Sequence, residues 1–294
     1  RKTQWGWVPR SADKATALVD LMKQEVLASK VIHTDDTPVR VQGDGQDGPF
    51  TGRFWVYVGD AAHPYTVYDY TPSRKRDGPA RFLEGYEGYL QADAFGGYDG
   101  IYASGEVIEV ACWAHCRRYF YDARSTDSNR AHRMLAWVRR LYDVERDAKK
   151  LDAQQRLALR QEQSKPLLET MKQWLDEQQP KLLPKSPIGD AANYALNNWN
   201  ALIRYLDDGD LDIDNNEAEQ ALRGIAIGRR NWLFLGSDRG GRAAAVHYSL
   251  IQSAKRHGLD PFAYLRDVLL RITAQGQANL HELLPDRWKA ALES

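Results

Sequence analysis

Cysteine, net charge and long apolar runs are all scarce in this chain of 294 residues. Its two cysteines, Cys112 and Cys116, lie in one short segment, which gives no disulfide framework and fits a reducing compartment. No apolar run approaches the roughly 20 residues that span a bilayer, and the N-terminal sequence RKTQWGWVPR lacks the apolar core of a signal peptide. We therefore expect a cytoplasmic protein.

The charges balance, with 40 basic and 40 acidic side chains. Nucleic-acid affinity comes largely from neutralising phosphates with basic side chains. A DNA-binding role would therefore require a concentrated local patch, or a grip on DNA that lies outside this chain. The apolar fraction of 43% and the charged fraction of 27% are otherwise ordinary for a globular enzyme.

The first part of the chain changes from helical to strand periodicity. Apolar residues at helical spacing predict a helix over 11–29. β-branched and aromatic runs bounded by Gly, Pro and Asp then predict three successive antiparallel strands, followed by a short helix and two more strands. The predicted strands lie at 31–41, 54–58, 65–70, 89–92 and 107–111, and the short helix at 79–88.

From Cys116 to Tyr205 the sequence is almost wholly helical and charged. Such a stretch between strand-rich and later helical elements predicts an inserted helical subdomain. The predicted fold class is α/β, a mixed sheet flanked by helices. The predicted organisation is a helical lead-in at 1–29, a first part of the core at 30–123, a helical insertion at 124–206 and a last part of the core at 207–294.

Two aspartates lie at strand positions where they could meet. Asp35 is within the first predicted strand, and Asp93 comes directly after the fourth. Carboxylates brought together repel unless a cation neutralises them, and hard oxygen ligands suit Mg²⁺ or Mn²⁺. A third carboxylate on a later helix would complete a two-metal site for phosphoryl transfer. If each aspartate is considered by itself, a structural role in a turn or as a helix cap is the simpler explanation.

Two glutamates compete for the third position, Glu217 and Glu219. Asp214 suits the N-cap of a helix, and Glu217 falls three residues later at the capping-box position. Glu219 has no such explanation, but it could form an ordinary surface ion pair with Arg223, four residues further on. Spacing therefore explains Glu217 and leaves Glu219 open between a metal ligand and a salt bridge.

Six segments, in order over nearly the whole chain, form a recognisable set. They are HTDDTPVRV (33–41), GRFWVYVGD (52–60), GYLQADAFGGYDGIY (88–102), ACWAHCRRYFYDA (111–123), DNNEAEQALRGIAIGRRNWLFLGSDRGG (214–241) and SAKRHGLDPFAYLRDVLLRI (253–272). Together they resemble the insertion sequence 66 family of bacterial transposases. Any one of them would be a weak signal, whereas six in order are specific.

The resemblance implies a ribonuclease-H-like fold that cuts and joins DNA at transposon ends. It carries the three catalytic, metal-binding carboxylates of the family onto Asp35 in D-[DE]-T-P, Asp93 in L-Q-x-D and Glu219 in D-N-N-x-x-E. These would hold two Mg²⁺ or Mn²⁺ ions, with the helical insertion between Asp93 and Glu219. The implied partners are DNA, further copies of the chain on that DNA, and accessory transposon proteins, at the bacterial nucleoid.

The chain departs from the family pattern at four positions. Gln220 stands where Arg usually follows the glutamate, which removes the basis for a phosphate contact by that side chain. Cys116 replaces a small residue, Arg230 a Lys and Trp232 a Tyr. None of the four is one of the three carboxylates.

A second group of side chains lies near a predicted helix start after the fifth strand. His115, Arg117 and Arg118 could contact DNA there, although His115 could instead be a hydrogen-bonded core histidine. Cys112, His115 and Cys116 together could suggest zinc, but no second ligand cluster is evident and the resemblance implies no metal at this place.

Basic residues also follow the candidate glutamate closely and suit bidentate phosphate contacts. They are Arg223, Arg229 and Arg230. Trp232 beside them could stack on an unpaired base, although a core position is the simpler interpretation. The glycine-rich turn at 237–241, which would open a helix, and the basic run at 74–76 are weaker candidates for DNA contact.

We expect the catalytic core of a DDE-type transposase, which cuts at the ends of an element and joins the freed 3′-OH to target DNA. A metal-dependent nuclease of the same fold would use water as its only nucleophile. A non-catalytic DNA-binding remnant is a third possibility, against which the complete set of three carboxylates argues.

Overall fold

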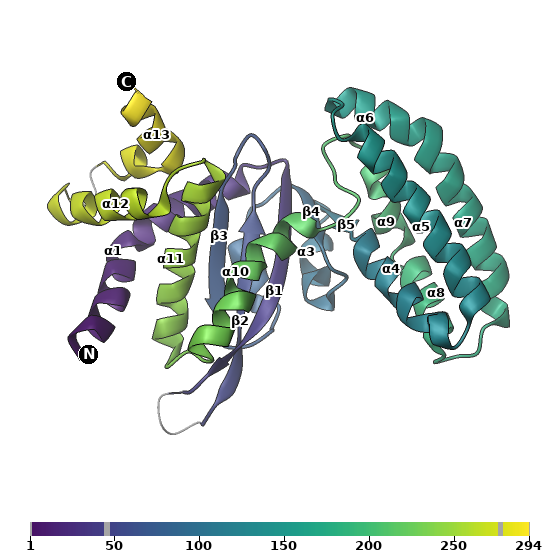
Figure 1. The fold of residues 1–294 in the computed structure, drawn as a ribbon, viewed down its shortest axis with the longest axis horizontal. Coiled ribbons are helices and arrows are strands. Elements are labelled where there is room, and N and C mark those ends of the chain that lie inside the picture. The colour runs from purple at the N-terminus through teal and green to yellow at the C-terminus, as the bar shows by residue number, and fades with distance from the viewer. Residues whose placement is uncertain (1, 44–47, 276–278, 294) are drawn as a thin grey trace. The chain divides into compact units, whose positions relative to one another are not determined.

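A computed structural model describes residues 2–43, 48–275 and 279–293 (Figure 1). Within those ranges the strands are β1 (Val31–Val41), β2 (Phe50–Val58), β3 (Thr66–Thr71), β4 (Gly88–Ala92) and β5 (Val107–Ala111). They form one mixed sheet in the order β3-β2-β1-β4-β5. β2 is antiparallel to both β1 and β3, so the prediction of three successive antiparallel strands is confirmed, as is the α/β class.

The helices precede, interrupt and follow the strands. They are α1 (Lys2–Leu27), α2 (Asp77–Phe82), α3 (Asp99–Tyr102), α4 (Trp113–Asp122), α5 (Ser128–Ala148), α6 (Ala153–Leu159), α7 (Lys165–Gln178), α8 (Pro187–Asn197), α9 (Trp199–Ile203), α10 (Asn216–Trp232), α11 (Asp238–Arg256), α12 (Pro261–Gln275) and α13 (Pro285–Glu293). No helix in the described ranges has both the length and the apolar character needed to cross a bilayer.

The short helix after β3 ends earlier than the sequence predicts. α2 stops at Phe82 instead of continuing to residue 88. Gly85 and Gly88 adopt φ angles of 75° and 145°, which a right-handed helix does not contain and which glycine tolerates. These two glycines therefore turn the chain out of α2 and into β4.

The chain divides into two compact units. The first comprises Arg1–Tyr89, Gly96–Val107 and Asn216–Ser294, and holds β1, β2 and β3 with α10 and α11. The second comprises Leu90–Phe95 and Ile108–Asn215, and holds the helices α4 to α9.

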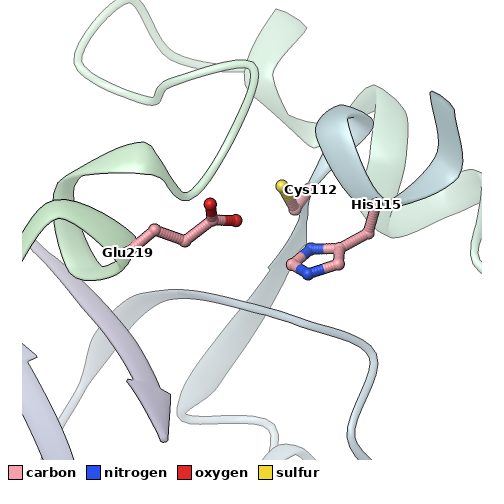
Figure 2. Close-up of side chains that lie close together, drawn as sticks. All are labelled: Cys112, His115 and Glu219. Carbon is pink, nitrogen blue, oxygen red and sulfur yellow. The ribbon is translucent and has the colours of Figure 1, made fainter. Parts of the chain in front are cut away.

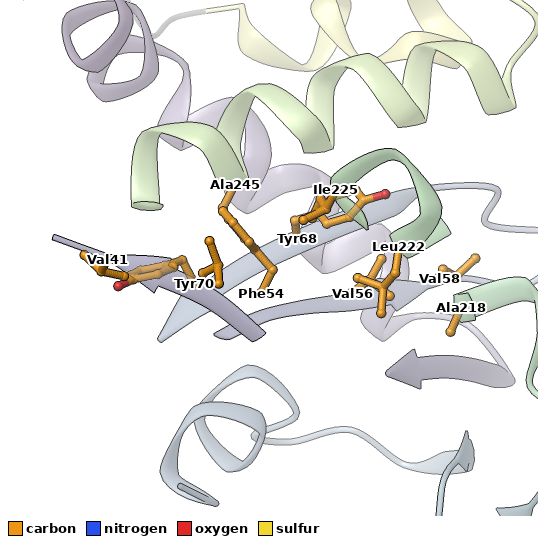
Figure 3. Packing of buried hydrophobic residues seen from close by; sticks show 11 residues of the cluster. Val41, Phe54, Val56, Val58, Tyr68, Tyr70, Ala218, Leu222, Ile225 and Ala245 are labelled. Atoms are coloured by element: carbon orange, nitrogen blue, oxygen red, sulfur yellow. The ribbon is translucent and has the colours of Figure 1, made fainter. Parts of the chain in front are cut away.

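In the first unit, strand register assigns the residues of β1 to two faces of the sheet. Asp35 lies opposite Val56, and Asp36 lies opposite Trp55. Because neighbouring side chains in a strand point to opposite faces, Asp35 and Asp36 project from different sides. Val56 belongs to the buried cluster beneath α10 and α11 (Figure 3), so Asp35 projects from the face that these two helices cover.

That cluster forms because one stripe of α10 is apolar. Ala218, Leu222 and Ile225 recur at spacings of four and three residues, which places them on one side of a helix. All three are buried against side chains of β1, β2 and β3. The full cluster contains Val39, Val41, Phe54, Val56, Val58, Tyr68, Tyr70, Ala218, Leu222, Ile225 and Ala245.

α11 also protects the outer edge of the sheet. β3 is an edge strand, and exposed edge groups invite unwanted pairing. The Ser249 hydroxyl accepts a hydrogen bond from the Tyr68 N–H at 2.8 Å, and the Ser253 hydroxyl accepts one from the Thr66 N–H at 3.0 Å. These buried serines therefore tie α11 to β3 and satisfy two N–H groups of the edge strand.

In the second unit, a buried ion pair joins α5 to a π-helical turn at Arg160–Ser164. Arg160 has no exposed surface, and its Nε and Nη2 donate to the two carboxylate oxygens of Glu145 at 2.8 and 2.6 Å. Its Nη1 donates to the carbonyl of Tyr205 at 3.0 Å. The guanidinium thus connects three segments of the helical unit.

We predict that Glu145→Leu lowers the free energy of unfolding of the helical unit by about 3–5 kcal/mol, because it leaves the buried charge of Arg160 without a counter-ion. The double substitution Glu145→Leu with Arg160→Met removes both charges and should be less destabilising than the single one. Urea unfolding followed by circular dichroism measures both. Equal stability of the single variant and the unsubstituted chain would contradict this role.

Candidate active site

Asp35 lies in the middle of β1 and is half-buried. Its Oδ1 accepts a hydrogen bond from the N–H of Asp36 at 2.7 Å. The strand register places it on the same face as Val56, which is buried in the cluster under α10 and α11. A carboxylate at this position projects beside the helix that carries Glu219.

The next residue, Asp36, forms ion pairs with two arginines on the other face of the sheet. Arg53 Nη1 donates to Asp36 Oδ2 at 2.8 Å, and Arg74 Nε donates to Oδ1 at 2.9 Å. The Asp36 side chain is only 2% exposed. The pair of arginines explains Asp36 structurally, and it also gives Arg74, part of the basic run at 74–76, a partner within the protein.

The rotation of α10 about its axis separates Glu217 from Glu219. Successive residues of a helix are about 100° apart, so these two glutamates project from opposite flanks of the stripe that contains Ala218. Glu217 Oε2 accepts from Arg256 Nη1 of α11 at 2.9 Å. Since Glu217 faces α11, the flank that carries Glu219 faces away from α11.

This geometry replaces the predicted capping explanation for Glu217. α10 begins at Asn216, so Glu217 is its second residue and not the third residue after an N-cap at Asp214. The Oδ2 of Asp214 accepts a hydrogen bond from the Tyr142 hydroxyl at 2.9 Å. Glu217 remains a structural residue, but its partner is Arg256.

Asp93 belongs to the second unit, where it directly follows β4 and is half-buried. Two residues earlier, Gln91 is fully buried and binds the segment that leads into α10. Its Nε2 donates to the carbonyls of Asp212 at 2.6 Å and Asp214 at 2.9 Å, and its Oε1 accepts from the Asp212 N–H at 3.3 Å. One amide side chain therefore makes three hydrogen bonds to this segment.

Two further contacts of the second unit hold the same segment. The Trp113 N–H donates to the Ile213 carbonyl at 3.1 Å, and the Asn215 N–H donates to Cys112 Sγ at 3.3 Å. α10 begins at the next residue, Asn216. The four residues that precede the helix of Glu219 are thus tied to β4 and to the start of α4.

Gln91 was not among the residues singled out from the sequence, although it stands in the L-Q-x-D motif. The available signal was a glutamine inside a predicted strand, two residues before a candidate aspartate. Its partners could not be identified, because they lie more than 100 residues away along the chain.

Cys112 is the N-cap residue of α4, and His115 lies in the first turn of that helix; Figure 2 shows both, together with Glu219 of α10. Burial raises the pKa of the Cys112 thiol to about 11, more than the Asn215 N–H lowers it. Burial likewise raises the pKa of Cys116 well above its usual value. Since the thiolate is the form that ligates metals, both cysteines favour a packing role.

The basic candidates differ in what they contact. Arg229 donates from Nη1 to the carbonyl of Pro38, so it ties the end of α10 to β1. Arg223 and Arg230 are exposed on α10. Trp232 is half-buried and packs against the cluster beneath α10, which favours the core interpretation of this residue.

Arg117 and Arg118 are exposed on α4 in the second unit. His115, two residues before them, is half-buried. Two exposed arginines in succession give the middle of α4 a basic surface.

Comparison with known proteins matches nearly the whole chain to one family. The family model described as "Transposase IS66 family" matches residues 1–243, and "IS66 C-terminal element" matches residues 249–285. Among curated relatives in Sinorhizobium fredii, the uncharacterized protein y4hP is 37% identical over 92% of this chain and 53% of its own length. The uncharacterized protein y4qI is 32% identical over 96% of this chain and 55% of its own length. The chain therefore spans little more than half the length of these relatives.

We predict that Gln91→Leu, which keeps the side-chain volume, lowers the free energy of unfolding by about 1–3 kcal/mol. The reason is that two carbonyls and one N–H lose a buried partner. Amide hydrogen exchange of the peptide containing Asp212 should become faster in this variant. Unchanged exchange at Asp212 together with unchanged stability would show that Gln91 does not hold this segment.

Proposed function

The chain belongs to the IS66 family of transposases, and on that premise we propose that it is the catalytic core of a DDE-type transposase of ribonuclease-H-like fold. It would cut DNA at the ends of a transposon and join those ends to target DNA. The observed strand order β3-β2-β1-β4-β5, with β2 antiparallel to both neighbours, supports this fold.

The observation that carries the proposal is the relation of Asp35 to Glu219 in the first unit. Asp35 projects from the sheet face that α10 covers, and Glu219 projects from the flank of α10 that faces away from α11. The acidic residues close to these two in sequence already form ion pairs: Asp36 pairs with Arg53, and Glu217 pairs with Arg256. The family motifs select the same two carboxylates.

The family motif supports Asp93 as the third member. Asp93 closes the L-Q-x-D motif and directly follows β4. It is half-buried, and Gln91 of the same motif is fully buried and hydrogen-bonded.

The donor set fits the metal that the family implies. Asp35, Asp93 and Glu219 offer the hard carboxylate oxygens that Mg²⁺ and Mn²⁺ prefer, and we propose that they hold two such ions. When bound, the ions would supply Lewis acidity to a phosphoryl transfer and lower the pKa of the attacking water.

The proposed reaction has two steps with the same bond changes. In cleavage, a bond forms between a water oxygen and phosphorus while the P–O3′ bond breaks, which leaves a free 3′-OH at the transposon end. In joining, that 3′-OH attacks a phosphorus of the target and releases a target 3′-OH. The second step conserves the number of phosphodiester bonds and needs no external energy source.

The exposed arginines are the proposed DNA contacts. Arg223 and Arg230 on α10, and Arg117 and Arg118 with His115 on α4, would bind phosphates and position the strand. Arg229 already binds the Pro38 carbonyl, and Trp232 packs against the core, so both would act mainly by supporting α10. Further copies of the chain and accessory transposon proteins are the other proposed partners.

We predict that Asp35→Asn, Asp93→Asn and Glu219→Gln each reduce Mn²⁺-dependent cleavage of DNA carrying the transposon ends by about 10³-fold or more. Each variant loses one ligand to the ions, whose charge stabilisation is worth several kcal/mol. Calorimetric titration with Mn²⁺ should show weaker binding in all three, while circular dichroism shows the fold retained.

Glu217→Gln is the matched control for Glu219→Gln, since it removes a carboxylate two residues away on the same helix. It breaks a half-exposed ion pair worth about 0–1 kcal/mol and should leave cleavage and Mn²⁺ binding unchanged. Full activity of Asp35→Asn would refute the assignment. Cleavage without any joined product from pre-cut ends would identify a nuclease instead.

A further inference from the structure

The outward side of α10 has a composition unlike the rest of this neutral chain. From residue 220 onward its exposed residues recur at helical spacing and are Gln220, Arg223, Gly224, Ile227, Arg230 and Asn231. Glu217, one turn earlier, is also exposed, and it pairs with Arg256. From residue 220 to residue 236 there are three arginines and no acidic residue. We call this exposed row the α10 stripe; it concentrates positive charge on one helix face.

Directly after the stripe, two large apolar side chains project into solvent. Leu233 is 65% exposed and Phe234 is 45% exposed. Leu233 has a φ of 60°, a left-handed conformation that is unfavourable for a bulky side chain. The chain thus combines an unfavourable backbone angle with exposed apolar surface at adjacent residues.

The backbone around this turn is held on both sides. The Leu233 N–H donates to the Arg229 carbonyl at 3.0 Å, which continues from α10. The Leu235 N–H donates to the Arg40 carbonyl at 2.8 Å, and the Gln42 N–H donates to the Leu235 carbonyl at 2.8 Å, which joins the turn to β1. Trp232 and Leu235 pack against the core, so the residues between them are forced outward.

We propose that Leu233 and Phe234 form an apolar wedge that stacks on unpaired bases at the end of a DNA substrate, while the α10 stripe binds the adjoining phosphates. Apolar and aromatic side chains stack on bases that have left the helix, and arginines neutralise the backbone. The inference rests on the proposed function and specifies the form of its substrate, DNA with separated terminal bases. Stacking thus moves from Trp232, the residue indicated by the sequence, to its exposed neighbours.

The charge of the surroundings favours DNA over a protein or a second copy of the chain as the occupant. An apolar wedge for a protein partner needs a rim matched to that partner. Arg223 and Arg230, in a segment without acidic residues from 220 to 236, instead match any phosphate backbone. Arg223 and Arg230 precede Leu233 and Phe234 along α10 and the turn that follows it. A DNA strand whose phosphates lie along α10 would therefore end with its terminal bases at the wedge.

The test compares a fully paired duplex with a forked duplex of the same length whose terminal bases are unpaired. Binding of the 294-residue chain is measured by fluorescence anisotropy in EDTA, so that no cleavage occurs. Leu233→Gly, which fits the positive φ, and Phe234→Ala should each weaken binding to forked DNA by about tenfold. Both should leave binding to the paired duplex and the salt dependence unchanged.

Two control variants separate stacking from other effects. Phe262→Ala removes another exposed phenylalanine, 78% exposed on α12, and should change neither affinity. Arg230→Gln should weaken binding to both DNAs and reduce the slope of log K against log salt by about one.

Three results would overturn the wedge. Phe234→Ala could lose equal affinity for both duplexes, it could lose affinity for neither, or the unsubstituted chain could bind the two DNAs equally well. A change in self-association by sedimentation with DNA binding intact would also overturn it and would identify a protein contact. Asp35→Asn should bind forked DNA like the unsubstituted chain. The binding test in EDTA and the metal-dependent cleavage test are therefore independent, and a negative result in one does not decide the other.

Discussion

The burial of Ala218, Leu222 and Ile225 against the sheet fixes the rotation of α10, and the chemistry assigned to that helix depends on this packing. With those three side chains inward, Glu217 reaches Arg256 of α11 and Glu219 occupies the opposite flank. Bringing Glu219 to the position that Glu217 occupies would require a rotation by two residues, about 200°, which would expose the three apolar side chains. The apolar stripe therefore selects the candidate ligand before any metal is considered.

The same packing also decides what the outer side of α10 presents. Opposite the buried stripe lie Arg223, Ile227 and Arg230, all exposed. The equal numbers of acidic and basic residues in the chain conceal this local excess, because charges elsewhere are paired internally, as Arg160 is with Glu145 and Asp36 with Arg53. Neutral composition and a cationic helix face are thus compatible.

Several features were predictable from local sequence. The three antiparallel strands, β4 and β5 follow from β-branched and aromatic runs bounded by turn residues, and the resemblance pointed to Asp35, Asp93 and Glu219. The partners of polar side chains were not predictable. Arg74 binds Asp36, Arg229 binds the Pro38 carbonyl and Gln91 binds the segment before α10, and each of these contacts joins residues distant in sequence.

The sequence by itself determined the order of the elements, the α/β class and the family, because periodicity, turn chemistry and motifs are properties of neighbouring residues. Only the tertiary structure decided that Asp35 shares a sheet face with α10, that Glu217 pairs with Arg256 and that Leu233 and Phe234 project outward. The physical reason is that strand register and helix rotation are set by packing between distant segments. A one-residue shift in strand register moves every side chain of that strand to the other face of the sheet, and a one-residue rotation of a helix turns its buried side by about 100°.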